Sequence, residues 1–192
     1  MAGDRLRALM RHGNKGALAL AFVLTLALSV LAGCGSEEET SAHEEGIPIK
    51  LGELEINVQE TRFLNPSQPD DSDYLAGQSL PPPPGKIYLG VFLTIHNDGD
   101  DPVRLPTNEE TTMVDTTGAT YHAIPSTTPF AAPLGAQLDG GGEIPAADSP
   151  AQSGPVQGAL VIFFVDLAVD ANRPLRLEID YQGETGEVTL DI

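Results

Sequence analysis

The sequence KIYLGVFLTIH at residues 86–96 decides the fold class of this chain. Its odd-numbered positions from Ile87 to Ile95 are Ile, Leu, Val, Leu and Ile, and Tyr, Gly, Phe and Thr lie between them. This period of two is typical of a β-strand that buries one face. The segment NDGDDP at residues 97–102 follows, and its Asn, Asp and Gly residues favour a turn before the proline ends the strand.

Similar alternation predicts further strands at residues 49–64, 111–115, 120–124, 156–166, 175–181 and 188–192, with a short edge strand at 102–105. The segment 156–166 is apolar on both faces between Leu160 and Val165, which indicates a strand covered on each side. About seven short strands and no convincing helix predict an all-β fold, an immunoglobulin-like β-sandwich, with a closed barrel as the competing topology. The expected inner faces carry Leu54, Ile56, Leu89, Val91, Leu93, Val161, Phe163, Leu177 and Leu190.

Two long segments interrupt this pattern, at residues 65–85 and 125–155. The first contains Pro81–Pro84 and is expected to form neither strand nor helix. The second is unusually long for a connection in a compact domain, which indicates a mobile or functional segment. Because loops on a rigid sandwich commonly carry recognition, these two segments are the predicted contact regions.

The N-terminus has the features of an export signal. Residues 1–15 are basic, and Ala17–Ala32 is an apolar run interrupted only by Thr25 and Ser29. A run of 16 residues is shorter than the roughly 20 that a membrane span needs, and it suits a signal-peptide core. We therefore expect a signal-peptide helix within residues 1–33.

The residues Leu31, Ala32, Gly33 and Cys34 resemble the bacterial lipobox at all four positions. The resemblance implies diacylglyceryl transfer to the Cys34 thiol, cleavage before Cys34 and attachment to the membrane, since two or more acyl chains hold a protein stably. A secreted protein with an incidental cysteine and an uncleaved anchor helix are the alternatives. Cys34 is the only cysteine, so no intrachain disulfide and no second thiol are available.

Charge separates the signal from the rest of the chain. The whole sequence has a net charge of −18, but the part after residue 33 holds 6 basic and 27 acidic residues, a net of −21. Such a surface repels nucleic acid and anionic headgroups. Residues 34–46 are polar and acidic, which predicts a lipidated, disordered tether, and residues 47–192 form the expected domain.

Metal and catalytic chemistry have few candidates. Asp98, Asp100 and Asp101 lie within four residues, and oxygen-rich loops suit calcium, but the spacing is not that of an EF-hand. His43, His96, His122 and Met113 are too scattered to predict a transition-metal site. The chain lacks the Gly-x-Ser-x-Gly, Ser-x-x-Lys and His-Glu-x-x-His motifs, so we expect a non-enzymatic protein with no cofactor.

The stretch GKIYLGVFLTIHNDGDDPVRL at residues 85–105 resembles the core of immunoglobulin-like, telokin-like lipoprotein domains of Gram-positive bacteria, a domain of unknown function. The similarity continues at residues 114–121, 154–158, 161–165 and 175–179, and the two long segments depart from it. The resemblance implies a fold and an envelope location and carries over no catalytic residue.

The leading prediction is a lipoprotein on the extracytoplasmic face of the cell membrane. It would present a binding module to an envelope protein partner and bind no nucleic acid. The alternative is a calcium-binding or small-solute-binding lipoprotein that uses the loop from Asp98 to Asp101.

Overall fold

The computed structural model describes residues 42–192, which form an all-β sandwich with helices of a single turn only. The predicted signal peptide, the lipobox residues, Cys34 and tether residues up to 41 lie outside the described residues. Within the described part of the chain, no helix is both long and apolar enough to cross a membrane.

The first sheet contains five strands, of which four run antiparallel to their neighbours. In order across the sheet they are β1 (His43–Glu44), β12 (Glu184–Leu190), β11 (Leu175–Tyr181), β6 (Thr111–Val114) and β7 (Thr120–Ile124). The two-residue strand β1 is the exception, because it pairs with β12 in the parallel direction.

The second sheet is antiparallel and contains the longest strands. Its order is β10 (Ala159–Asp166), β4 (Lys86–Asn97), β3 (Leu54–Leu64) and β2 (Ile49–Leu51), and β9 (Glu143–Ile144) pairs with the far end of β4. A separate ribbon joins β5 (Val103–Arg104) to β8 (Gln137–Leu138).

Strand β7 connects the two sheets along one side of the sandwich. Its residues Thr120–His122 pair with β6, whereas Ala123 and Ile124 pair with β10. On the other side no backbone ladder joins β2 to β12. There the sheets meet through side chains: the Ile49 side chain of β2 packs so closely on Gly186 of β12 that a Cβ added at Gly186 would lie only 2.6 Å from Cδ1 of Ile49. The hydrogen-bonded path therefore does not close, which confirms the sandwich over the barrel.

The main core lies between the two sheets. On β4, the buried residues Leu89, Val91 and Leu93 face it. All nine residues predicted for the inner faces belong to this core: Leu54, Ile56, Leu89, Val91, Leu93, Val161, Phe163, Leu177 and Leu190.

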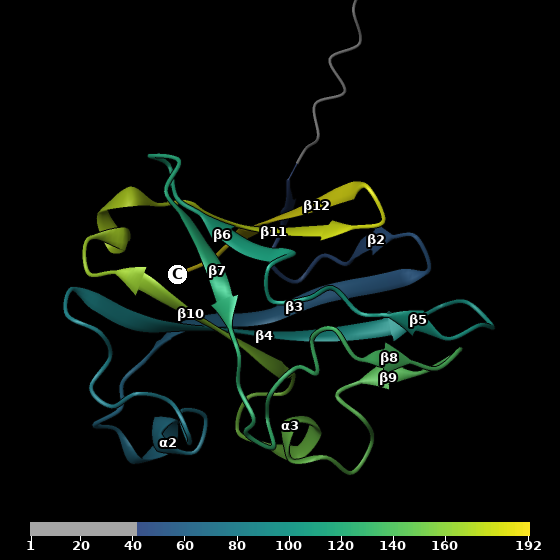
Figure 1. The fold of residues 1–192 in the computed structure, drawn as a ribbon, viewed down its shortest axis with the longest axis horizontal. Helices are drawn as coiled ribbons and strands as arrows, with labels where there is room; N and C mark the ends of the chain where they lie inside the picture. The colour runs from purple at the N-terminus through teal and green to yellow at the C-terminus, as the bar shows by residue number, and fades with distance from the viewer. Residues whose placement is uncertain (1–41) are drawn as a thin grey trace, which may run out of the picture. The chain divides into compact units, whose positions relative to one another are not determined.

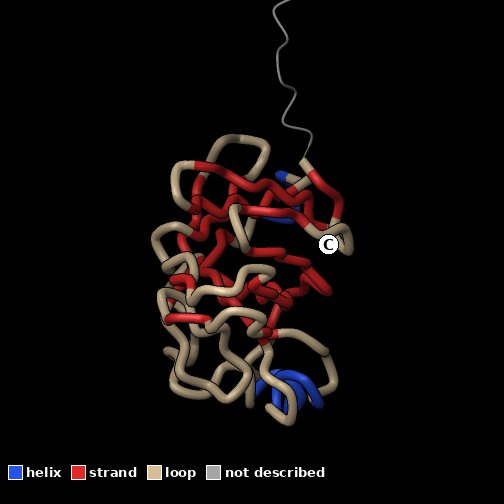
Figure 2. Tube along the Cα trace, turned by 90° about the vertical axis from the view of Figure 1, so that its right-hand side faces the viewer, coloured by secondary structure: helices blue, strands red, loops and turns tan. Residues whose placement is uncertain are grey.

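A second core lies on the outer face of the second sheet. Its buried residues are Leu64, Tyr74, Leu75, Tyr88, Phe92, Leu160 and Ile162. Residues 65–85 and 125–155 cover this face. The described residues therefore form three layers: the first sheet, the second sheet and a layer made by these two segments, which contains the helical turns α2 (Pro69–Ser72) and α3 (Pro150–Ser153) (Figures 1 and 2). The prediction that β10 is covered on both faces is confirmed.

One prediction needs correction. Residues 65–85 were expected to contain no helix, but they contain the helical turn α2, whose proline occupies the first turn, where its missing N–H costs nothing. Residues 125–155, for which a mobile or functional segment was expected, contain β8, β9 and α3, and the Ser149 hydroxyl caps α3. Both segments pack against the second sheet.

The boundary between tether and domain also moves. The tether was expected to extend to residue 46, but His43 and Glu44 pair with β12. The Gly46 amide donates to the Val58 carbonyl, and the Glu45 carboxylate accepts from the Asp191 amide at 3.0 Å. The acidic composition of these residues predicted disorder. Their pairing could not be predicted, because it is made with a strand that lies far along the chain and leaves no pattern in the local sequence.

Candidate functional site

Tyr74 joins the parts of the insertion layer, a name we use for residues 65–85, the first insertion, together with residues 125–155, the second insertion. Its ring meets Phe92 of β4 edge-to-face, with centroids 5.2 Å apart, and Phe130 of the second insertion at 4.7 Å. Tyr74 is only 2% exposed. One side chain thus joins both insertions to the sheet, at geometries that aromatic pairs prefer.

An ion pair fixes the first insertion to β3. Nη2 of Arg62 lies 2.7 Å from Oδ1 of Asp71, and the other carboxylate oxygen accepts from the Asn65 amide at 2.8 Å. The Arg62 guanidinium also lies 5.6 Å from the ring of Tyr74 and 5.8 Å from that of Phe92. Because Asp71 is 4% exposed, this pair holds α2 against the sheet from a largely desolvated position.

The two insertions also contact each other. Nε2 of Gln78 donates to the Pro125 carbonyl at 2.9 Å. The Tyr88 hydroxyl, which is buried on β4, donates to the Ser79 carbonyl. These bonds order loop backbone that carries no regular structure, so the layer is a continuous surface.

Charge on the insertion layer has one sign. Its two segments contain no Lys or Arg and six acidic residues: Asp70, Asp71, Asp73, Asp139, Glu143 and Asp148. Of these, Asp71 is neutralised by Arg62, and the other five are exposed. A basic partner would therefore be attracted to this face and an acidic one repelled.

A pocket of about 240 Å³ opens beside the second insertion. It lies at the edge of β10, which pairs with two different parts of the chain. Ile162 pairs with Ile124 of β7, and Leu160 pairs with Ala131, so the residues between Ile124 and Ala131 form a loop that leaves β10 and rejoins it. Leu160 and Val161 are buried beneath it. The rest of its wall comes from Asn108, Ile124, Pro125, Ser126, Ala132, Pro133 and Leu134.

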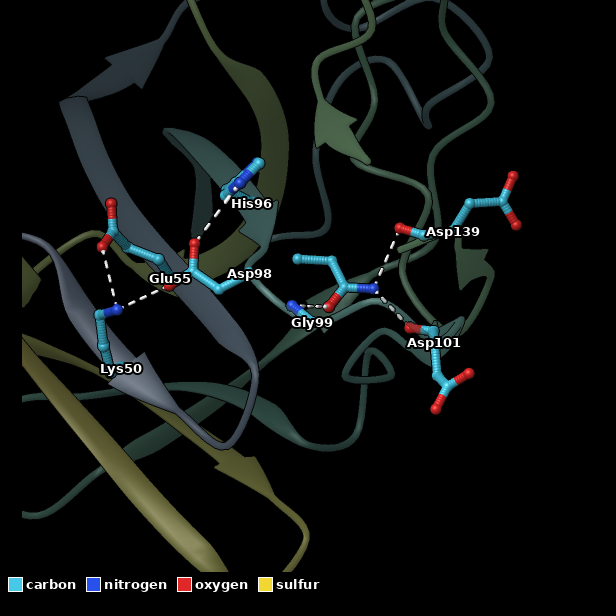
Figure 3. A network of polar contacts seen from close by, with 8 residues as sticks. Lys50, Glu55, His96, Asp98, Gly99, Asp101 and Asp139 are labelled. Carbon is cyan, nitrogen blue, oxygen red and sulfur yellow. Dashed lines mark hydrogen bonds and ion pairs between the residues drawn. The ribbon is translucent and has the colours of Figure 1, made fainter. Parts of the chain in front are cut away.

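The predicted calcium loop has another arrangement. Asp98 Oδ2 lies 2.6 Å from Nζ of Lys50, and its Oδ1 lies 3.4 Å from Nε2 of His96 (Figure 3). The hydrogen bond between Lys50 and Asp98 raises the pKa of Lys50 and lowers the pKa of Asp98. Glu55 completes the cluster, 3.7 Å from Lys50. The Asp98 carboxylate is therefore already matched by a cation.

Asn97, which sequence reasoning missed, organises this loop. It is fully buried, and its Nδ2 donates to the carbonyls of Asp101, Leu138 and Asp139 while its Oδ1 accepts from the Gly99 amide. Asp101 and Asp139 contribute backbone oxygens to this bonding, and their carboxylates point away (Figure 3). Asp98, Asp100 and Asp101 do not converge, and the described residues hold no cluster of three metal-ligating side chains.

A third polar cluster lies at the end of the sandwich near η1 (Val169–Asn172). Asp115 accepts bonds from Thr117, from the Ala119 amide and from Asn172, and these bonds, led by that of the Thr117 hydroxyl, lower its pKa to about 2. Burial and the neighbouring Asp166 raise the pKa of Tyr121 to about 12. The bonds to Thr117 and Ala119 hold the β6–β7 turn together, and the bond from Asn172 joins that turn to η1.

The scattered histidines and Met113 remain apart. Met113 is fully buried in the main core. His43 is exposed on β1, and His122 lies 3.7 Å from a carboxylate oxygen of Glu109.

Comparisons with known proteins give structural likeness only. No family model and no curated protein matches the chain. The yjhA protein of Bacillus subtilis is 12% identical over 78% of this chain and 99% of its own, with a TM-score of 0.50. An uncharacterised β-sandwich protein of Clostridium difficile is 17% identical over 81% and 98%, at 0.47, and the secreted protein MPT63 of Mycobacterium tuberculosis is 13% identical over 79% and 96%, at 0.45. At such identities the likeness concerns the fold alone.

Proposed function

We propose that this chain is a lipid-anchored, extracytoplasmic lipoprotein that acts as a non-enzymatic interaction module, with the insertion layer as its partner-binding surface. The observation that carries the proposal is the construction of that layer. Arg62, Tyr74 and Gln78 fix two proline-rich segments to the second sheet and to each other. A loop held in one conformation loses less entropy when it binds than a mobile loop does.

The path of the chain supports this assignment. Residues 35–42 separate Cys34 from β1, so a fully extended connection spans at most about 30 Å. The chain enters the domain in the first sheet, and the insertion layer lies beyond the second (Figure 1). A module anchored at Cys34 would be held near the bilayer, with its insertion layer able to face outward.

The ionisable groups support a non-enzymatic role. Those with displaced pKa values bond to neighbours within the fold, as Asp98 does with Lys50 and Asp115 with Thr117. Catalytic acids and bases are instead tuned while facing a cleft that admits substrate. The charge of the insertion layer favours a basic segment on the partner.

The anchor is tested by cell fractionation. We expect Cys34→Ala to move the protein from the membrane fraction to the soluble fraction or to leave it as uncleaved precursor. The matched control Ser36→Ala should fractionate like the wild type. Unchanged membrane association and processing of Cys34→Ala would contradict the anchor.

The binding surface is tested by site-specific photo-crosslinking in intact envelopes. A benzophenone amino acid is placed at Asp73 or Gln152, both exposed on the insertion layer. Matched control sites are His122 and Asp180, on the outer face of the first sheet. We expect the same adduct from both insertion sites and none from the controls. Equal adducts from the two faces, or adducts from the controls alone, would contradict the assignment.

A further inference from the structure

An exposed, proline-rich surface lies at the end of the sandwich where β4 begins and β10 ends, at the left in Figure 1. Residues 80–84 are exposed apart from the half-buried Pro82, and Leu80 is 54% exposed. Leu167, which follows β10, is 63% exposed, and its amide donates to the Gly85 carbonyl at 3.1 Å. We call residues 80–85 together with Leu167 the proline surface. It holds two of the three large apolar side chains that the described residues expose.

The backbone of this surface is fixed by its own sequence and by bonds at both ends. Proline holds φ at about −65°, so four consecutive prolines have little backbone freedom to lose on binding. Just before the segment, the Ser79 carbonyl accepts from the hydroxyl of Tyr88, which is buried on β4. At its end, the Lys86 amide donates to the Pro83 carbonyl at 3.0 Å and closes a turn in which Gly85 has a φ of 80°. A partner would therefore meet a preformed surface.

The hydrogen-bonding capacity of this segment is one-sided. Residues 81–84 are all proline and have no N–H, so their backbone presents acceptors and no donor. Of these four carbonyls, only that of Pro83 accepts a hydrogen bond from the described residues. The surface thus combines exposed apolar side chains with free carbonyl oxygens, and a complementary partner must bring donors on apolar groups.

Tryptophan and tyrosine have this combination, an apolar ring that carries one N–H or O–H group. Grooves lined with aromatic side chains are a recurring way to bind proline-rich segments. Leucine or phenylalanine side chains, or lipid acyl chains, would cover Leu80 and Leu167 but leave the carbonyls without donors. The surface therefore favours a protein groove over the membrane.

A second copy of this chain does not offer such a groove. The sequence contains no tryptophan. Its four tyrosines are all at most 6% exposed: Tyr74, Tyr88, Tyr121 and Tyr181. The rings with donors must therefore come from a different protein.

We propose that the proline surface docks in a groove of the envelope partner lined by tryptophan and tyrosine, whose N–H and O–H groups donate to the free proline carbonyls. This contact rests on the proposed function, because its prolines lie within the first insertion, and it names the chemistry by which the partner recognises that insertion. The side chains of Leu80 and Leu167 are covered in the complex.

The proposal is tested by NMR titration of the mature chain, residues 34–192, in detergent micelles. The probe is a capped pentapeptide in which three tryptophans alternate with two serines. Matched peptides carry leucine, or tryptophan methylated at the indole nitrogen, in place of tryptophan. We expect saturable shifts of the Leu80 and Leu167 methyl groups, with intermolecular NOEs from the indole rings to proline ring protons. The methylated peptide should bind about two- to tenfold more weakly, the range for one lost hydrogen bond, and the leucine peptide should give no saturable shift.

Variants of the chain locate the site. Pro83→Ala combined with Pro84→Ala restores backbone N–H groups and backbone freedom, and should weaken the tryptophan peptide about threefold or more. Leu167→Ser removes the neighbouring apolar side chain and should weaken it about three- to tenfold. Pro102→Ala, which removes an exposed proline outside the insertion layer, is the matched control and should leave binding unchanged.

Several results would overturn the assignment. Absence of saturable shifts and indole NOEs in the wild type would exclude the surface as a site, whether or not the variants fold. Equal binding of the leucine peptide would exclude an aromatic groove, and equal binding of the methylated peptide would exclude donation to the carbonyls. Broadening of the Leu80 and Leu167 methyl signals by a doxyl-labelled fatty acid, without peptide, would assign the surface to the membrane. Adducts from Asp73 and Gln152 would persist in each case, so failure here is distinguishable from failure of the proposed function.

Discussion

Replacing Tyr74 by phenylalanine should stabilise this protein. The Tyr74 side chain is 2% exposed, and its hydroxyl has no hydrogen-bond partner among the residues that the structure describes. Its edge-to-face contacts with Phe92 and Phe130 involve the ring, which the substitution retains. Tyr74→Phe therefore removes an unsatisfied polar group and leaves the packing in place.

The size of the effect follows from the cost of such a group. A buried donor or acceptor without a partner costs about 1–3 kcal/mol. We expect a gain of about 1 kcal/mol in the free energy of unfolding. The gain is at the low end of this range because removal of the oxygen leaves a small void, and the atoms around it lose dispersion contacts. With a urea m-value of about 2 kcal/mol/M, the unfolding midpoint should rise by about 0.5 M.

Tyr88 supplies the matched control. It is equally buried in the same core, but its hydroxyl donates to the Ser79 carbonyl. Tyr88→Phe should therefore lower the free energy of unfolding by about 1 kcal/mol. Urea titrations followed by far-ultraviolet circular dichroism measure both variants. A loss of stability in Tyr74→Phe as large as that in Tyr88→Phe would refute the reasoning.

Three further predictions concern other parts of the domain. The folded pKa of Asp115, about 2, lies below its ordinary 3.8, so its stabilisation is present above pH 4 and lost as the pH falls towards 2. Asp115→Asn should flatten the acid limb of a plot of Tm against pH. Gly186→Ala should cost about 1–3 kcal/mol in urea unfolding, because its Cβ would lie 2.6 Å from Ile49. Millimolar calcium should not raise the Tm beyond a magnesium control, and a saturable rise would restore the loop at Asp98 as a site.

The sequence was sufficient to predict the strands whose buried faces follow from a local pattern of apolar residues. The alternation along β4 identified its inner face, and the apolar run from Leu160 to Val165 identified a strand covered twice. Both predictions succeed because a strand exposes its side chains to opposite faces with a fixed period of two. Burial then follows from apolarity, without knowledge of the partner strand.

The insertion layer could not be predicted in the same way. Tyr74 and Phe130 are 56 positions apart, and neither stands in a periodic pattern. Asn97 looked like an ordinary turn residue, although its amide bonds to carbonyls about 40 residues away. Such contacts depend on tertiary arrangement, and composition alone favours disorder wherever proline and acidic residues accumulate.

The outer face of β4 and β10 explains why the insertions exist. Tyr88, Phe92, Leu160 and Ile162 would lie in water on a bare two-sheet sandwich, and an exposed apolar face of that kind promotes association. Covering it is therefore a requirement of the fold, and the buried residues of the insertions are committed to that purpose. Only the outward positions of the layer remain free to be shaped by a partner. The recognition proposed here consequently belongs to a surface that stability already holds in place, so substitutions at its exposed positions should change binding without loosening the core.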